Sequence, residues 1–293
     1  SARHGDSEAS VAPPGDLDLR GGLLLNTANT LIRLGSGGDG GPRNLEQAVR
    51  YYRQREALGL PYESQDQEAL ALYNLGRAES LLGDWGRARV HLRRARDNYE
   101  KAGARDLVYD ISNRLHSVAF KRSLEGESSM TEEAWLEGVR ALDLAKSLNL
   151  ESDQARLQRQ LCGTALMRKD PEGSLRHGEE AMKRLGQIRG MKRGFLSLKV
   201  DFPVMDNDPT EAAEGFDADH SERIIHTWMA QAARQLPDFR LAKEHLEANR
   251  TAYGRLKKRE TLISIIESNL GSIAFERGLL GEAEGHFVRA RDF

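Results

Sequence analysis

The chain has 293 residues, of which 39% are hydrophobic, and 43 Lys and Arg stand against 45 Asp and Glu, a formal net charge of −2. This length suffices for two ordinary domains or for one elongated repeat array with a large buried core. The near-neutral balance disfavours nucleic acid and anionic membranes as partners, and no apolar run approaches the roughly 18 residues that a transmembrane helix needs.

Cys162 is the single cysteine. It excludes an internal disulfide framework and suits a reducing compartment, so we expect an intracellular, cytoplasmic protein. The thiol belongs to an apolar stripe with Leu161 and Leu166, which favours packing over catalysis. No cluster of a nucleophile, a base and an oxyanion donor is recognisable, so the sequence predicts no catalytic residue and no enzyme.

The acidic segment at 206–208 lacks the glycine and the terminal glutamate that a calcium loop carries at fixed spacing. The eight histidines form no i, i+4 pair of the zinc-protease kind. We therefore expect neither a metal nor a cofactor.

The beginning of the chain, up to Leu58, predicts a tail and one helix pair. Residues 1–16 hold little apolar material and two adjacent prolines, which indicates a disordered tail. A first helix is expected from about Leu17 to Leu34, followed by a glycine-rich loop at 35–42. The partner helix is expected from about Asn44 to Leu58.

The stretch from Leu70 to Ala95 shows the pattern that organises the chain. Leu72, Leu75 and Leu82 follow the rhythm of an amphipathic helix, and Gly83-Asp84 is typical of a turn. Taking Gly76 as the origin, small and large apolar residues follow at spacings of 12, 16 and 19, namely Ala88, Leu92 and Ala95. This spacing predicts two short antiparallel helices, with Gly76 leaving room for the second helix to come close.

The same spacing recurs further along the chain. It starts again from Ala230, with Ala242, Leu246 and Asn249, and from Gly271, with Ala283, Phe287 and Ala290. Two weaker copies lie between, where Leu115-His116 and Cys162-Gly163 occupy the position of Leu75-Gly76. In the copy at Cys162-Gly163 the second helix fits only with a one-residue slip, to Ser174, Gly178 and Ala181.

This pattern resembles the tetratricopeptide repeat (TPR) family, whose first helix carries Leu-Gly and whose second helix carries Ala, Phe or Leu, and Ala. The step from Gly76 to His116 exceeds that of the commonest form, and it resembles the longer-helix variety found in animal polarity adaptors and in sensor arms of bacterial regulators. The resemblance implies an all-α, right-handed superhelical solenoid of about six antiparallel helix pairs. Repeats 1–4 are expected at 17–186 and repeats 5–6 at 220–293, with the array continuing in a longer protein.

One gap breaks this rhythm. Gly163 and Ala230 stand much farther apart than one repeat step, and the excess is the segment 187–219. The segment begins basic and turns acidic, and loops of this length are usually functional or disordered. We interpret it as a charged insertion or linker, with a lid over the binding groove as one hypothesis.

The resemblance further implies that the first helices form a concave groove that holds another polypeptide. Asn74 and Asn269 precede Leu-Gly, where groove-binding relatives use an amide to hold a ligand backbone, although a solvated helix face is an equal alternative. Trp228 is a candidate groove anchor. The predicted partner-binding residues are Tyr73, Asn74, Arg77, Asn113, Arg114, Ser117, Gln160, Trp228, Gln231, Arg234 and Asn269.

Two functions fit this sequence. The leading hypothesis is a scaffold or adaptor for protein–protein interaction that binds a peptide or a partner segment in the groove. The alternative is a regulatory or sensor arm of a larger multidomain protein, such as a signal-responsive regulator or a protease. The sequence indicates neither the identity of the partner nor the oligomeric state.

Overall fold

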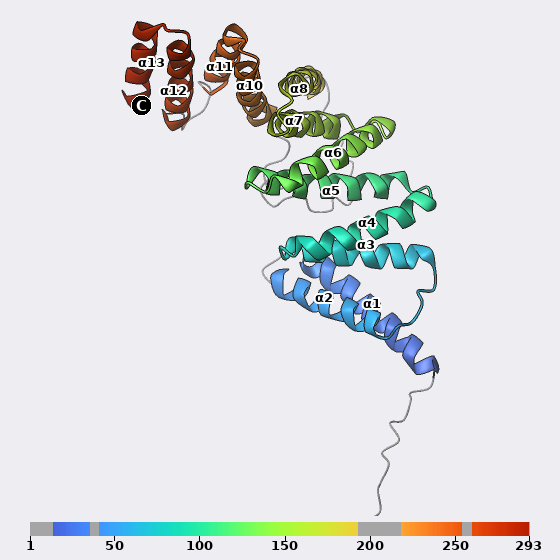
Figure 1. Ribbon diagram of the computed structural model, residues 1–293. Coiled ribbons are helices and arrows are strands. Elements are labelled where there is room, and N and C mark those ends of the chain that lie inside the picture. The colour runs from blue at the N-terminus through green and yellow to red at the C-terminus, as the bar shows by residue number, and fades with distance from the viewer. Residues whose placement is uncertain (1–13, 36–40, 193–217, 254–259, 293) are drawn as a thin grey trace, which may run out of the picture. The chain divides into compact units, whose positions relative to one another are not determined.

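The computed structural model describes residues 14–35, 41–192, 218–253 and 260–292, and all the elements assigned in these ranges are α-helices (Figure 1). Consecutive helices form six antiparallel pairs, so the predicted all-α fold of paired helices is confirmed. The pairs are α1 (Pro14–Gly35) with α2 (Gly41–Ala57), α3 (Gln65–Leu81) with α4 (Trp85–Lys101), α5 (Arg105–Leu124) with α6 (Ser129–Ser147), α7 (Glu151–Met167) with α8 (Pro171–Lys192), α10 (Ala218–Gln235) with α11 (Phe239–Tyr253), and α12 (Glu260–Glu276) with α13 (Leu280–Asp292).

The chain divides into two compact units, residues 1–111 and 112–293, which we describe separately. Helix α1 begins at Pro14, so residues 14–16 of the expected tail are helical, and α8 continues through 187–192 of the expected insertion. The rest of the tail (1–13) and of the insertion (193–217) lies outside the described residues, so its disorder and the lid stay predictions. The handedness of the superhelix also stays a prediction.

Short turns with local caps join the two helices of a pair. Asp84, Asp170 and Asp238 each stand directly before the second helix, and their carboxylates accept hydrogen bonds from backbone N–H groups of its first turn at 3.4, 2.8 and 3.0 Å. Gly83 and Gly278 close the first helices at φ of 82° and 74°, a conformation that glycine adopts without strain. Turn chemistry thus fixes where α4, α8 and α11 begin.

A first helix contacts both its partner helix and a neighbouring pair, and one residue defines its register. We call the residue at the Gly76 position the slot residue; the slot residues are Gly76, His116, Cys162, Ala230 and Gly271. In α10 and α12, the residues five and one positions before the slot pack on the preceding pair. In α12 these are Ile266 and Leu270, which contact Ala242 and Leu246 of the α10–α11 pair in one core cluster. Helix α10 uses Ile225 and Met229 in the same way against the α7–α8 pair. Pair-on-pair stacking therefore repeats one contact pattern.

Within a pair, a small residue on one helix meets a large residue on the other. A Cβ atom added to Gly76 would lie 2.8 Å from Leu92, and one added to Gly271 would lie 2.8 Å from Phe287. The third pair exchanges the two roles, because His116 stands on the first helix and its ring lies 2.7 Å from where a Cβ of Gly138 would be. The pairs therefore keep the close approach although the sequence pattern degenerates.

The one-residue slip expected in the fourth pair disappears when Cys162 is taken as the slot residue in place of Gly163. The Cys162 Sγ atom lies 3.4 Å from the Ser174 hydroxyl and 3.4 Å from where a Cβ of Gly178 would stand. Gly163 serves a different contact, since its missing side chain makes room for the ring of Trp228 from α10, 3.0 Å from the Cβ position. Cys162 therefore forms the contact between α7 and α8, and Gly163 forms the contact between α7 and α10.

We expect Gly76→Ala to lower the free energy of unfolding by about 1–3 kcal/mol, because the new methyl group meets Leu92 and the Ala88 carbonyl oxygen. Urea denaturation followed by circular dichroism measures the change. Gly86→Ala is the matched control: no atom lies within 4 Å of its Cβ position, so a neutral effect or a gain of up to about 1 kcal/mol is expected. In a Leu92→Ala background the Gly76→Ala cost should shrink, and an undiminished cost would contradict the proposed fit.

Candidate functional site

In the first unit, the predicted site residues on α3 are bound into the protein itself. Tyr73 is 1% exposed, and its hydroxyl donates to the Asp110 carboxylate at 2.5 Å. The half-buried Asn74 donates from Nδ2 to Asn29 Oδ1 at 2.8 Å, and the same oxygen accepts from the Tyr52 hydroxyl at 2.5 Å. Tyr73 and Arg77, at 8% exposure, offer little surface to a ligand, and Asn74 is oriented by its neighbours.

In the second unit, Arg156 brings together two predicted residues that are far apart in the sequence. Its guanidinium donates from Nη2 to Asn113 Oδ1 at 3.1 Å and from Nη1 to Gln160 Oε1 at 3.5 Å, and it pairs with Asp153 at 2.8 Å. Gln160 is 5% exposed, so it supports Arg156 from beneath and is not a surface contact. Arg156 was not recognised from the sequence, although its i, i+4 spacing to Gln160 places both on one helix face.

The ring of Trp228, the candidate groove anchor, is half-buried between helices. It packs edge-on against Phe120 of α5, with centroids 5.9 Å apart, and lies over Gly163 of α7. A large ring inserted between helices stabilises the stack by burying apolar area. The Trp228 ring lies here because Gly163 has no side chain and leaves space for it. The sequence pattern had assigned that space to α8, the partner helix of α7.

The remaining predicted residues lie at or near the surface of the second unit. Arg114, Ser117 and Asn269 are half-buried, and Gln231 is exposed. Arg234 is half-buried and pairs with Glu276 of α12. Together with the half-buried Asn113, the residues Gln231 and Asn269 place amide groups on three different first helices.

A recurring histidine on the second helices was not recognised from the sequence. It stands at i+15 from the slot residue in four pairs, and in each pair its Nδ1 atom contacts a polar side chain of the first helix. The contacts are His91 to Glu79 at 2.6 Å, His177 to Gln158 at 2.6 Å, His245 to His226 at 3.1 Å and His286 to Glu267 at 2.8 Å. Three of these partners stand four positions before the slot. The constant spacing of these histidines from the slot residue was the sequence signal that could have identified them.

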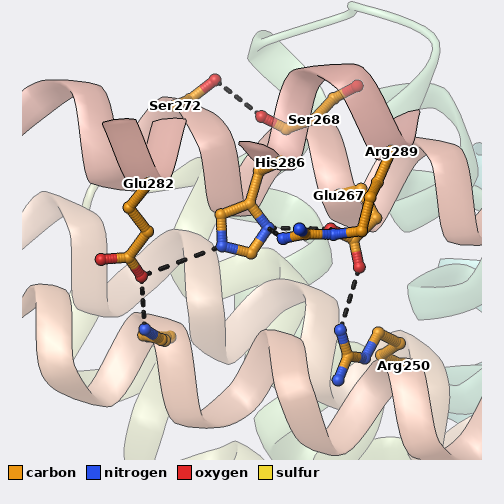
Figure 2. Close-up of polar contacts among 8 residues, drawn as sticks. Arg250, Glu267, Ser268, Ser272, Glu282, His286 and Arg289 are labelled. Atoms are coloured by element: carbon orange, nitrogen blue, oxygen red, sulfur yellow. Dashed lines mark hydrogen bonds and ion pairs between the residues drawn. The ribbon is translucent and has the colours of Figure 1, made fainter. Parts of the chain in front are cut away.

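Figure 2 shows the most elaborate of these contacts, around Glu267. This carboxylate is 2% exposed and accepts hydrogen bonds from Arg250 at 3.0 Å, from Arg289 at 3.0 Å and from the His286 ring at 2.8 Å. Burial by itself would raise the pKa of Glu267, but these three hydrogen bonds outweigh it and lower the pKa. The carboxylate therefore stays ionised and ties α12 to α13 and to α11.

The His226–His245 pair is the exception, because neither partner is acidic. One imidazole N–H donates to the ring nitrogen of the other, and the ring centroids are 5.3 Å apart. Burial lowers the pKa of both rings, and for His245 burial and the neighbouring His226 together lower it to about 4 against an opposing effect of Glu244. Both rings are accordingly neutral near pH 7.

Three observations on the described residues concern thiol chemistry, metal binding and membrane crossing. Burial raises the pKa of the Cys162 thiol to about 12, so a nucleophilic thiolate is absent at neutral pH. Across the described ranges, no group of three or more His, Cys, Asp or Glu side chains could hold a metal ion. In the same part of the chain, none of the helices combines the length and the apolar character that crossing a membrane requires.

Paired helices that stack on one another define the fold class: the chain has a TPR-like helical-repeat fold. It is similar to the solved structure of BtubC from P. vanneervenii, with 14% identity, 94% of this chain and 90% of that chain covered, and a TM-score of 0.53. It is also similar to RapI in its apo form, with 10% identity, 93% and 96% coverage, and a TM-score of 0.51.

NprR in complex with its cognate peptide NprX aligns with 13% identity over 97% of this chain and 69% of that chain. Its TM-score of 0.45 is too low to support an argument about this chain. No protein-family model and no curated protein matches the sequence. At these identities the likeness shows the fold alone.

The lowered histidine pKa values predict a loss of stability in acid. The unfolded chain binds protons at its histidines near pH 6.5, whereas folded His116, at a pKa of about 4, and His245 remain neutral. Since the unfolded state binds more protons, the free energy of unfolding should fall as pH drops from about 6.5 toward 4.

His226→Glu should reduce that loss between pH 7 and pH 5 by about 1 kcal/mol, because a carboxylate beside His245 raises its pKa, and partial exposure of the ring limits the effect. Urea denaturation at both pH values measures it. Gln231→Glu adds the same charge at an exposed position of α10 and serves as the control. An equal acid loss in His226→Glu and in the unaltered chain would show this prediction to be wrong.

Proposed function

We propose that this protein is a scaffold for protein–protein interaction, which binds a peptide or an extended partner segment along its first helices. The observation that carries the proposal is the set of amide side chains on three first helices of the second unit: Asn113 on α5, Gln231 on α10 and Asn269 on α12. An extended peptide presents one donor and one acceptor per residue, and an amide side chain matches both.

The contacts around Asn113 support a binding role because they fix its orientation. Arg156 donates to its Oδ1 atom, and Arg156 is itself held by Asp153 and Gln160. An amide that is already oriented loses less conformational entropy when a ligand binds, so more of the interaction energy contributes to affinity. In the first unit, the bonds from Asn74 and Tyr52 to Asn29 form a comparable network.

The buried members of the predicted site have a supporting role in this proposal. Tyr73, Arg77 and Gln160 shape and orient the first helices from inside, whereas the surface amides meet the ligand. We also propose that the chain belongs to the longer-helix variety of TPR proteins, because Gly271 stands at i+41 from Ala230. The packing of Ala230 and Leu270 in one core cluster supports that assignment.

The test begins with a random peptide library displayed on phage and selected against the intact chain. Synthetic versions of the enriched peptides should bind the Gln231→Ala/Asn269→Ala variant at least about tenfold more weakly by fluorescence anisotropy, equivalent to about 1.4 kcal/mol. The control variant is Arg240→Ala/Glu244→Ala, an exposed ion pair on the second helix α11, which should leave affinity unchanged. Failure to enrich any peptide, or equal affinity in both variants, would contradict the proposal.

A further inference from the structure

The polar contact between α10 and α11 is formed by two rings that can each take up a proton. At the same two positions, four before and fifteen after the slot, the sixth pair has Glu267 and His286. The fifth pair has His226 and His245, whose Nδ1 atoms lie 3.1 Å apart. One N–H donates to the other ring nitrogen, so at least one Nδ1 atom must carry no proton. Acid therefore acts directly on the atoms that form this contact.

Two buried polar atoms of α11 have no hydrogen-bond partner among the described residues. They are Nε2 of His245 and Oδ1 of Asn249. The Nδ2 atom of Asn249 donates to the Thr227 hydroxyl of α10 at 2.8 Å, so its amide is only partly satisfied. Separation of the two helices would expose both unpaired atoms to water. The closed pair therefore lacks hydrogen bonds that the open pair can make.

The apolar contact between the same two helices consists largely of alanine. Ala230 and Ala233 of α10 are buried in one core cluster with Ala242 and Leu246 of α11. Alanine buries little apolar area, so separating these helices exposes less apolar surface than separating helices joined by large side chains. The two polar contacts thus carry a larger share of what holds α11 to α10.

Two carboxylates from the pair itself act on the rings. Glu222 lies one turn before His226 on α10, and Glu244 directly precedes His245 on α11. Both favour a protonated ring, but burial outweighs them and lowers the pKa of both histidines, that of His245 to about 4. The rings therefore resist protonation while the helices are packed together.

The helices around this pair supply apolar contacts and charges that are already paired. Helices α7 and α8 meet α10 in a core cluster that includes Cys162 and Leu185. Helices α12 and α13 present Glu267 and Glu282 to α11, and these carboxylates pair with Arg250 and Lys243, respectively. The acids of α12 and α13 are thus engaged by other cations of α11.

We propose that the His226–His245 contact is a pH-sensitive switch that releases α11 from α10 when both rings are protonated. The first added proton occupies a nitrogen outside the contact and leaves a positive charge in a half-buried place. The second puts N–H groups on both Nδ1 atoms, and the two charged rings repel each other. Because α12 packs on α11, release also changes how the last described pair is attached.

The direction of the pH dependence follows from the open state. Hydrated rings titrate near pH 6.5, whereas the closed rings hold lower pKa values, so the open pair binds more protons. The free energy that keeps the pair closed is therefore present in full above about pH 6.5, and it falls as the pH drops toward 4.

Hydrogen–deuterium exchange of the intact chain, measured by mass spectrometry at pH 7 and pH 5, tests the switch. Protection factors in α11, corrected for the intrinsic exchange rate, should fall at least about tenfold at pH 5. His226→Gln/His245→Gln keeps hydrogen-bonding side chains that do not titrate, and it should abolish this fall. The matched control is His177→Gln, which removes the ring at the same position of the fourth pair and should retain the fall in α11.

A second variant keeps the test decisive if the double variant folds poorly. His226→Glu places beside His245 the type of acid that the sixth pair uses, and it should reduce the fall in α11. Equal protection of α11 at both pH values would overturn the proposal, and so would a fall that persists unchanged in the folded variants. A fall of equal size from α5 to α13 would also overturn it, because acid would then unfold the unit as a whole.

Discussion

The second, third and sixth helix pairs depend on one small residue facing one large residue across the two helices. Where Gly76 meets Leu92 or Gly271 meets Phe287, no room exists for a Cβ atom. Close packing of this kind fixes both the distance and the register of the two helices, since a shift by one residue would bring two large side chains together. The register in turn determines which residues point toward the preceding pair, the following pair and solvent.

The fold was predictable from the sequence because this contact leaves a linear trace. The spacing of 12, 16 and 19 after Gly76 and Gly271 records which side chains meet between antiparallel helices. The third and fourth pairs were harder, because the same volume is filled differently: His116 carries the bulk that the second helix supplies elsewhere, and Cys162 takes the slot beside a glycine that serves the next pair. A pattern of residue types does not show such an exchange.

The site was less predictable for a related reason. Position on a helix face gave the approximate location of Asn113 and Gln231, but it did not reveal that Arg156 reaches Asn113 or that Trp228 enters the space above Gly163. Such contacts join helices that are distant in the sequence, and they depend on the lengths and rotamers of particular side chains. Periodicity reports the direction of a side chain and leaves its partner undetermined.

Buried polar contacts restrict the register of the paired helices further than the apolar contacts do. Apolar side chains tolerate small shifts of one helix along another, whereas a buried carboxylate such as Glu267 must keep its partners, because an unpaired charge at 2% exposure is strongly destabilising. The histidine at i+15 from the slot therefore acts as a register marker in the fourth, fifth and sixth pairs, where its partner four positions before the slot is Gln158, His226 or Glu267.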